Sequence, residues 1–307
     1  MRESDLLRHI YARSAGVSGP GDGPIIVGPG DDCAVIRGDG LLLVTVDQLV
    51  EGRHFLLSAA GQGESGQLDR VARKALARSV SDIAAMGGRP MAALAAACYR
   101  QGFGGADQLF DAMHRWAAHW GCPLIGGDIA THDGPLVLSV TVIGTAHEAR
   151  GPVLRSGARV GDAVYITGRL GGSLESGRHM DFEPRTAEGQ WLAGTLGERL
   201  HAMMDISDGL GRDGGRMAEA SGVRIEIESS LVPRHHGVPS WERAVSDGED
   251  YELLFTADPE WEATPTAGDA GALISRIGSV VHGSGCVVRS ESGAWIEVGE
   301  HGWEHGA

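Results

Sequence analysis

The hydrophobic and polar positions of this 307-residue chain follow two periods, one typical of strands and one typical of helices. Short apolar runs bounded by glycine, proline or charged residues predict strands. They lie at 25–27, 41–46, 123–125, 136–145, 163–167, 224–227 and 252–256, with two or three more between 285 and 298. Longer segments with apolar residues three or four positions apart predict helices. They lie at 3–12, 68–86, 106–120, 190–200 and 210–221.

The order of these elements indicates the fold class and the domain organisation. Strands and helices mix in both halves of the chain, which predicts an α/β or α+β class. Segment 92–98 fits either a buried strand or a helix. The pattern changes around 147–161, and a chain of this length fits two domains. We therefore predict one domain over 1–148 and a second over 149–307.

Composition and charge exclude several functions. Glycine occurs 48 times, about twice its usual share of ~7%, which predicts many tight turns or a close approach of backbone to a ligand. The net charge of −15 argues against nucleic acid and anionic membranes as partners and fits a protein that collects cations. Lys74 is the only lysine, so no phosphate-binding GxxxxGK[ST] loop exists.

The cysteines and the N-terminal segment point to a cytoplasmic protein. Four cysteines without CxxC or zinc-type spacing do not form a disulfide framework. Residues 1–16 are polar and amphipathic, unlike a signal peptide, and no apolar run is long enough to span a membrane.

Several apolar runs lead into an aspartate. Asp31, Asp47, Asp128 and Asp205 each follow one, and Asp208 comes three residues after Asp205. Carboxylates at the ends of neighbouring strands would converge on one edge of a sheet and repel one another unless cations neutralise them. Hard oxygen ligands select Mg²⁺ or Ca²⁺. For any single aspartate a turn or a helix cap is the alternative.

Asp82 needs a separate interpretation, because it lies within the predicted helix 68–86 rather than after a strand. Arg78 precedes it by one turn, so an ordinary ion pair between the two is the alternative to a metal site.

The linear motifs resemble those of the thiamine-monophosphate kinase family. GPGDDCAV at 28–35, TVDQLVEGRHF at 45–55, SDIAAMGG at 81–88, DISDGL at 205–210 and GEDYEL at 248–253 occur in that family's order. The resemblance extends over nearly the whole chain, from Gly28 to Trp303. The same ordered motifs are shared with the superfamily of aminoimidazole ribonucleotide synthetase and selenophosphate synthetase.

The resemblance implies a fold and a set of ligands. The N-terminal domain would form a β-barrel across a homodimer, and an α+β C-terminal domain would close over the cleft. ATP and several Mg²⁺ ions would bind between the domains. The Mg²⁺ ligands implied are Asp31, Thr45, Val46, Asp47, Asp82, Asp128, Asp205 and Asp208, with Val46 contributing only through its backbone.

The resemblance also implies roles in catalysis and substrate binding. ATP would be bound by Gly127, Asp128, Arg155 and Ser207. Catalysis would depend on Asp47, Asp128 and Asp208. Thiamine monophosphate would be bound by His54, Glu249 and Trp303, with the indole stacking on the cationic rings. The alternatives are a core histidine at position 54 and a tail residue packed on the surface at position 303.

The expected reaction is direct transfer of the γ-phosphoryl group of ATP to the phosphate of thiamine monophosphate, without a phosphoenzyme. A phosphate monoester is mostly ionised near neutral pH, because its second pKa is ~6, so it needs no strong base. It does need its negative charge balanced and its oxygen held in line, which magnesium ions and an arginine supply.

The chain departs from the family pattern at four places. Val46 stands where a hydroxyl residue is usual, and Asp247 replaces a glycine. The segment between Ser173 and Met203 is short, and the chain lacks the usual final aromatic residue. Two rival functions follow: another ATP-dependent enzyme of the superfamily with a different small-molecule substrate, and a nucleotide-binding paralogue without catalysis.

Overall fold

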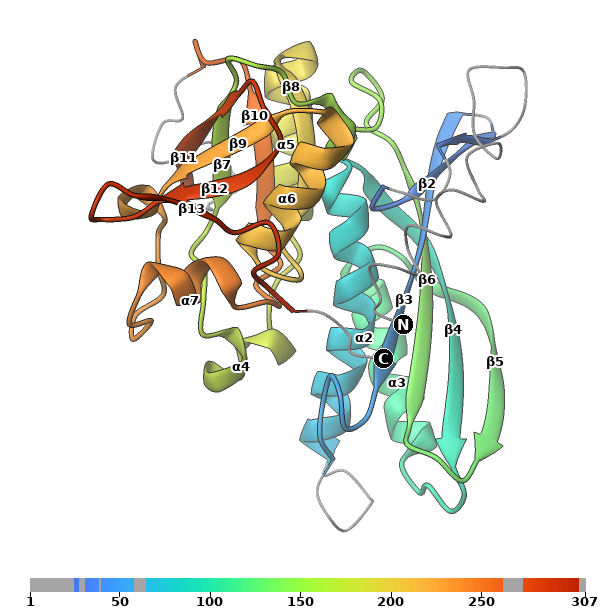
Figure 1. The fold of residues 1–307 in the computed structure, drawn as a ribbon. Helices are drawn as coiled ribbons and strands as arrows, with labels where there is room; N and C mark the ends of the chain where they lie inside the picture. Colours follow the sequence, from blue (N-terminus) through green and yellow to red (C-terminus); the bar gives the residue numbers. More distant parts are fainter. Residues whose placement is uncertain (1–24, 28–30, 39, 58–64, 262–272, 304–307) are drawn as a thin grey trace.

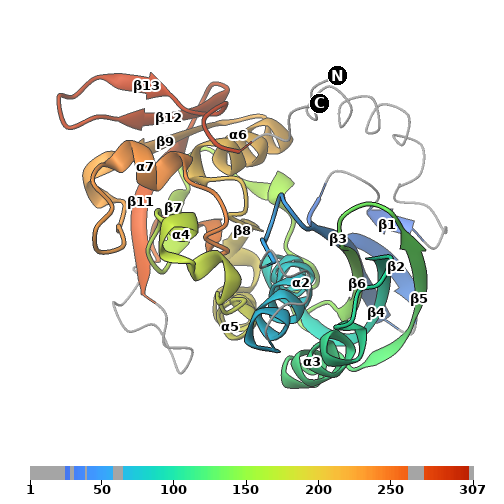
Figure 2. The same cartoon turned by 90° about the horizontal axis from the view of Figure 1, so that it is seen from below.

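The computed structural model describes residues 25–27, 31–38, 40–57, 65–261 and 273–303. Two β-sheets, each covered by helices, lie side by side (Figures 1 and 2). One is built from the chain before residue 146 and the other from residues 163 onward. The expected helix at 3–12 and residues 28–30 of the first motif lie outside the described residues.

The first sheet has six strands in a mixed arrangement. Neighbours pair antiparallel except β4 and β5, which run parallel and are joined by α3 (Ala106–His119). Helices α3 and α2 (Ser65–Ala85) cover one face. In spatial order the strands are β1 (Ile25–Val27), β2 (Ala34–Gly38), β3 (Gly40–Val50), β6 (Val137–Thr145), β4 (Arg89–Arg100) and β5 (Leu124–His132).

The second sheet has seven strands, of which only the pair β12 and β9 is parallel in the described residues. Alternate residues of its strands enter two apolar cores, one under α6 (Leu210–Ser221) and one under α5 (Thr186–Leu196). Its strands in spatial order are β13 (Trp295–Glu297), β12 (Gly285–Arg289), β9 (Arg224–Glu228), β11 (Ile274–Val281), β7 (Ala163–Thr167), β10 (Leu253–Ala257) and β8 (Leu200–Asp205).

Short helical segments connect these strands. They are α4 (Ser173–Ser176), α7 (Trp241–Ser246) and the single turns η1 (Arg155–Gly157), η2 (Arg178–Met180), η3 (Gly197–Arg199) and η4 (Ser229–Leu231).

Helix α2 lies between the two sheets (Figures 1 and 2). Its apolar residues pack into the core of the first sheet, while Ala85 joins the core beneath α5. Because both sides are covered, the helix is buried over most of its length, polar residues included. Polar groups buried in this way require partners, and those partners form the site described below.

Most of the expected elements are confirmed, with differences that depend on strand pairing. Segment 92–98 is a strand, because β4 pairs with β6 on one side and β5 on the other. The expected helix at 190–200 is wrong in extent: α5 spans Thr186–Leu196, and Leu200 already begins β8. Strands β2 and β11 have no counterpart among the sequence predictions.

Asp47 and Asp128 do not follow the ends of their strands, as the apolar runs suggested. Ladder pairing carries β3 on to Val50 and β5 on to His132, so both aspartates are strand residues. The expectation is confirmed for Asp205, the last residue of β8.

The described part of the chain contains no helix that is both long and apolar enough to cross a membrane. In the same residues β1 and β5 are edge strands of the first sheet. That sheet therefore does not close into a barrel within one protomer.

Candidate functional site

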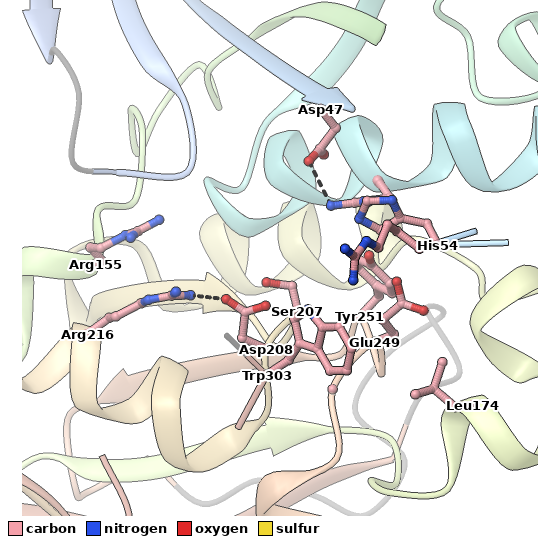
Figure 3. A pocket seen from close by; sticks show the side chains of 13 residues that line it. Asp47, His54, Arg155, Leu174, Ser207, Asp208, Arg216, Glu249, Tyr251 and Trp303 are labelled. Atoms are coloured by element: carbon pink, nitrogen blue, oxygen red, sulfur yellow. Dashed lines mark hydrogen bonds and ion pairs between the residues drawn. The ribbon is translucent and has the colours of Figure 1, made fainter. Parts of the chain in front are cut away.

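A cavity of about 280 Å³ opens between the two halves of the molecule (Figure 3). The first half contributes side chains from β3, the turn after it and α2. The second contributes the segments that follow β8 and α7, together with the C-terminal end of the described chain. The lining residues are Asp47, Arg53, His54, Arg78, Arg155, Leu174, Ser207, Asp208, Arg216, Gly248, Glu249, Tyr251 and Trp303.

One face of α2 organises this region. Lys74, Arg78 and Asp82 follow one another at four-residue intervals, so they lie one above another along the helix. Each is bonded to a side chain that arrives from another element. Their partners are, in the same order, Glu249, Asp47 and Thr45.

The bond between Arg78 and Asp47 answers a question left open by the sequence. The guanidinium donates to Asp47 Oδ1 over 3.2 Å and to the carbonyl of Gln48 over 3.0 Å. Asp82 instead accepts a hydrogen bond from the Thr45 hydroxyl. The i,i+4 pairing of Arg78 with Asp82 is therefore replaced by bonds from each of them to β3.

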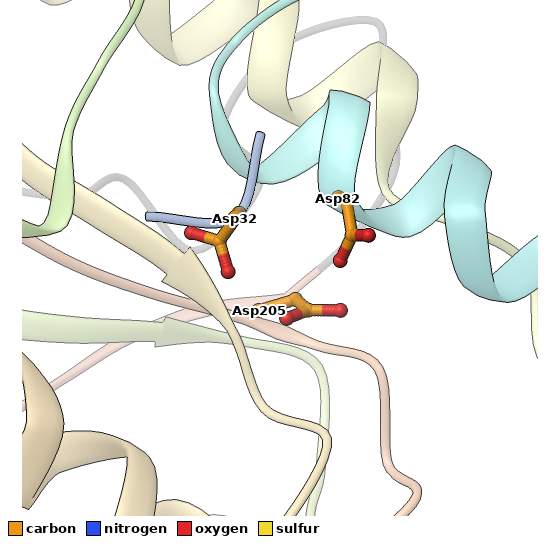
Figure 4. A group of neighbouring side chains, drawn as sticks. All are labelled: Asp32, Asp82 and Asp205. Atoms are coloured by element: carbon orange, nitrogen blue, oxygen red, sulfur yellow. The ribbon is translucent and has the colours of Figure 1, made fainter. Parts of the chain in front are cut away.

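Three carboxylates converge beside the cavity. Asp32 follows β1, Asp82 belongs to α2 and Asp205 ends β8, and one oxygen of each lies within 4.8 Å of the others (Figure 4). Ser81 donates to Asp205 Oδ2 over 2.6 Å and orients it. Three elements distant in sequence thus bring negative groups to one point.

Burial, and then repulsion between the carboxylates, raises the pKa of Asp82 well above its ordinary value. The same two causes, in the same order, raise the pKa of Asp205, although the Ser81 hydroxyl opposes them. For Asp32 burial also raises the pKa, and the Arg155 guanidinium only partly offsets this. The cluster therefore resists holding three charges without a cation.

The donor set fits Mg²⁺. All three groups offer hard carboxylate oxygens. Asp32 Oδ2 is buried and has no hydrogen-bond partner within the described residues. A buried acceptor left in this state is costly unless something binds it. The cluster is thus suited to a divalent cation.

Arg155 links the cluster to the second half of the chain. Its guanidinium forms a 2.7 Å ion pair with Asp32, and its backbone N–H donates to Asp31 Oδ2 over 3.2 Å. Both aspartates are therefore bonded to Arg155, but only Asp32 also belongs to the cluster with Asp82 and Asp205.

Two of the expected metal ligands on β3 point toward α2, and one points away. Thr45 and Asp47 lie on the inner face, where they meet Asp82 and Arg78. Val46 between them is 61% exposed on the outer face, as the alternation of a strand requires.

Asp128 and Gly127 lie apart from the cavity. Both belong to β5, the edge strand, and Asp128 is exposed. In register Asp128 is opposite Ala96, Ala96 opposite Ser139, and Ser139 opposite Gln48. Asp128 is thus level with the residue after Asp47, but three strands away, or about 14 Å.

Ser207 and Asp208 line the cavity where β8 gives way to α6. Both of their backbone N–H groups donate to Asp213, a buried residue of α6. The Asp208 carboxylate forms a 2.6 Å ion pair with Arg216 (Figure 3). The C-terminal end of the described chain returns to this point, because the N–H of Trp303 donates to the carbonyl of Asp208.

His54 and Glu249 line the same cavity and are connected through Lys74. Lys74 Nζ lies 2.7 Å and 2.9 Å from the two Glu249 oxygens and 2.9 Å from the carbonyl oxygen of His54. The imidazole Nδ1 accepts from the N–H of Val50, which fixes the turn that follows β3. His54 is only half-buried, so it is not a core histidine.

Trp303 is 48% exposed and lines the cavity. Of the residues expected to bind the thiamine group, the structure therefore brings all three to one cavity.

Sequence reasoning missed several lining residues, above all the arginines at 53, 78 and 216. Their side chains give the cavity four guanidinium groups, counting Arg155, opposite Asp47, Asp208 and Glu249. The signal available for Arg78 and Arg216 was helical spacing: one lies a turn before Asp82, the other two turns after Asp208. The sequence could not single out Asp32, because the adjacent Asp31 carries the same carboxylate group.

Comparison with known proteins finds relatives that match this chain over most of its length. Residues 30–146 match the family model of the AIR synthase related protein N-terminal domain, and residues 183–291 match that of the C-terminal domain. A thiamine-monophosphate kinase of Rhodopirellula baltica is 34% identical over 302 residues, which cover 92% of each chain. The enzyme of the same name from Bacillus subtilis is 34% identical, covering 85% of this chain and 86% of that one.

A solved structure described as AaThiL complexed with AMPPCP and TMP has 29% sequence identity and a TM-score of 0.77. The superposition covers 99% of this chain and 97% of that one. Hydrogenase maturation protein HypE, at 18% identity and a TM-score of 0.71 in its complex with HypF, shares the fold. The chain therefore has the two-domain fold of the AIR synthase related proteins and belongs to the thiamine-monophosphate kinase family.

Proposed function

We propose that this protein transfers the γ-phosphoryl group of ATP to thiamine monophosphate and forms thiamine diphosphate. The observation that carries the proposal is the cavity between the two halves of the chain, which four arginines line and beside which three carboxylates converge. A reaction between two phosphate groups needs cations on both sides of the transferred group. The two substrates follow from a relative whose structure is described with AMPPCP and TMP.

Asp32, Asp82 and Asp205 are the residues of this chain that would hold Mg²⁺. Thr45 is bonded to Asp82, Asp31 is bonded to Arg155, and Asp47 and Asp208 line the adjoining cavity. Bound there, the ion would neutralise negative charge on the phosphate oxygens of ATP. Arg155 adjoins the cluster and reaches the same oxygens from the second half of the chain, where its planar fork suits a phosphate.

The acceptor end of the cavity needs positive charge rather than a base, because the attacking oxygen belongs to an ionised phosphate. Arg53 and Arg78 line that space and balance its charge, whereas Arg216 pairs with Asp208 on the side of Arg155 (Figure 3). The indole of Trp303 offers a flat face on which the cationic rings of thiamine would stack. His54 and Glu249 would contact the same substrate. We infer direct, in-line transfer, so no aspartyl or histidyl phosphate forms during turnover.

The first experiment is incubation of the protein with ATP, Mg²⁺ and thiamine monophosphate, followed by chromatography of the products. Thiamine diphosphate is the expected product. Asp47→Asn is expected to lower its rate of formation about a hundredfold, since a metal-site charge contributes several kcal/mol and ~1.4 kcal/mol is a factor of ten. Mg²⁺-dependent ATP binding without this product would refute the thiamine assignment and leave the nucleotide site standing.

We also propose that the protein works as a homodimer in the cytoplasm. The outer face of the first sheet is uncovered in one protomer and carries exposed apolar side chains at Val46 (61%) and Leu94 (36%), which lie on the same face because both are register partners of Thr141. An apolar face of this kind marks an interface. A second copy would cover it and complete a barrel from two open sheets, with Asp128 at the new boundary.

The dimer is tested by light scattering during gel filtration. The wild-type chain of 32.1 kDa is expected to elute at twice that mass. Leu94→Asp, on this outer face, is expected to elute as a monomer, since it places a charge in the proposed interface. Leu231→Asp, at a site 50% exposed in η4, is the matched control and leaves the dimer intact. A monomeric wild-type protein at all concentrations contradicts the proposal.

A further inference from the structure

We infer that Lys74 is a positioning residue for the acceptor substrate: it holds the Glu249 carboxylate and the turn bearing His54 in one arrangement across the two halves of the molecule. Lys74 does not line the cavity, and its side chain is fully buried. It would therefore set the affinity for thiamine monophosphate without touching it. The inference rests on the proposed function.

The bonds of Lys74 join two segments that are distant in the sequence. The ammonium group has three donors, and within the described residues they meet the two oxygens of Glu249 and the carbonyl oxygen of His54, all within 2.9 Å. Glu249 is 175 positions away along the chain. One buried cation thus ties β3's following turn to the loop between α7 and β10.

Glu249 is held in an unfavourable backbone conformation. Its φ of +62° lies in the left-handed region, which costs a non-glycine residue energy, and Tyr251 has a φ of +52°. The loop keeps this shape because the N–H of Glu249 donates to the carbonyl of Ser207 over 2.7 Å, and the Ser173 hydroxyl donates to the carbonyl of Glu249. Backbone strain that is kept at the wall of the cavity indicates that the position of the Glu249 carboxylate serves substrate binding.

The exposure of the pair shows which partner faces the ligand. Lys74 is 0% exposed and the Glu249 side chain 18% exposed, so the carboxylate alone reaches the cavity. Without the ammonium group, Glu249 would be free to turn toward Arg78, which lines the same cavity. The binding surface at the acceptor end would then differ, while the carboxylate cluster around Asp205 would stay the same.

The test compares Lys74→Met, Glu249→Gln and the double variant by steady-state kinetics. Lys74→Met is expected to raise the KM for thiamine monophosphate about tenfold with kcat nearly unchanged, which marks lost binding rather than lost chemistry, and to change the KM for ATP less than about twofold. The double variant is expected to fall well short of the product of the two single effects, because Lys74 acts mainly through that carboxylate. Lys74→Arg, which keeps the charge but changes its geometry, should raise the same KM about threefold.

Arg73→Met is the matched control. Arg73 is the neighbour of Lys74 on α2, is also buried, and bonds to Phe182 and Glu183 instead of to cavity residues. It is expected to lower the melting temperature without raising the KM for thiamine monophosphate. If Lys74 had only a structural role, Lys74→Met would behave like Arg73→Met: the melting temperature would fall and the KM for thiamine monophosphate would not rise.

A pH profile adds a readout that a structural role would not change. Burial lowers the pKa of Lys74 to about 8, opposed by Glu249 and assisted by Arg78, and His179 also senses its charge. Above that pH the lysine loses its proton and its ion pair, so the wild-type KM for thiamine monophosphate should rise. The rise should be absent in Lys74→Arg, which stays charged.

The outcomes separate this inference from the proposed function. A wild-type protein that neither binds nor phosphorylates thiamine monophosphate would overturn both. Wild-type turnover with an unchanged KM in Lys74→Met and Lys74→Arg would overturn the inference alone. So would a Lys74→Met effect that multiplies with that of Glu249→Gln.

Discussion

Asp82→Asn is expected to lower Mg²⁺-dependent turnover by about a thousandfold or more, since several kcal/mol of charge stabilisation are lost with the ion. The same change is expected to make the metal-free protein more stable. Asp82 lies in a buried cluster with Asp32 and Asp205, and its pKa is raised by burial first and by the neighbouring carboxylates second. An amide of the same shape still accepts from Thr45 but carries no charge.

The direction of the pH effect follows from this raised pKa. A carboxyl group whose folded-state pKa exceeds its unfolded value favours the fold below the unfolded pKa, and this contribution is lost as the pH rises through the folded pKa. Near neutral pH the wild-type cluster is therefore destabilising without metal. Asp82→Asn removes this group's share of the penalty, so the metal-free variant should be the more stable protein.

Thermal unfolding with and without Mg²⁺ measures both effects. In the wild type Mg²⁺ should raise the melting temperature, because binding at a hundred times Kd contributes ~2.7 kcal/mol. In Asp82→Asn the metal-free melting temperature should be higher and the response to Mg²⁺ small. Asp111→Asn, on the exposed face of α3, is the control and should behave as wild type. A lower metal-free melting temperature in Asp82→Asn would falsify the interpretation of the cluster.

Gly127→Ala is expected to destabilise the protein by about 3 kcal/mol, the upper part of the range for forced overpacking. A methyl group at this position would lie 1.9 Å from the carbonyl oxygen of Ala95, its register partner on β4. That carbonyl cannot retreat, because β4 is paired on both sides. The neighbouring position gives a matched control, since a methyl group at Gly126 meets only Leu94 Cδ2 at 3.5 Å.

Urea unfolding of both variants separates the two positions. Gly127→Ala should shift the midpoint to a lower urea concentration with an unchanged slope, and Gly126→Ala should change stability by less than ~1 kcal/mol. Equal stability of the two variants would contradict the packing argument. Gly127, which was expected to contact the nucleotide, is thus required to be glycine by the packing of the sheet alone.

The sequence alone determined the local structure and the chemistry of the groups. Apolar periods of two and of about 3.6 residues, with glycine and proline at the ends, placed α6 and β7 at their observed bounds and α2 close to them. These features depend only on residues near one another in the chain, so they can be read before folding is known. The ordered aspartate motifs likewise pointed to the family that the comparisons established.

Only the tertiary structure decided which of these groups meet. Asp31 and Asp32 carry the same group at adjacent positions and both bond to Arg155, yet only Asp32 places an oxygen in the cluster. Asp128 fits the motif but lies three strands from Asp47 in the sheet, because pairing order is not sequence order. Lys74 finds Glu249 because α2 is enclosed between two sheets, and a charge buried there must bind whatever partner that packing brings to it.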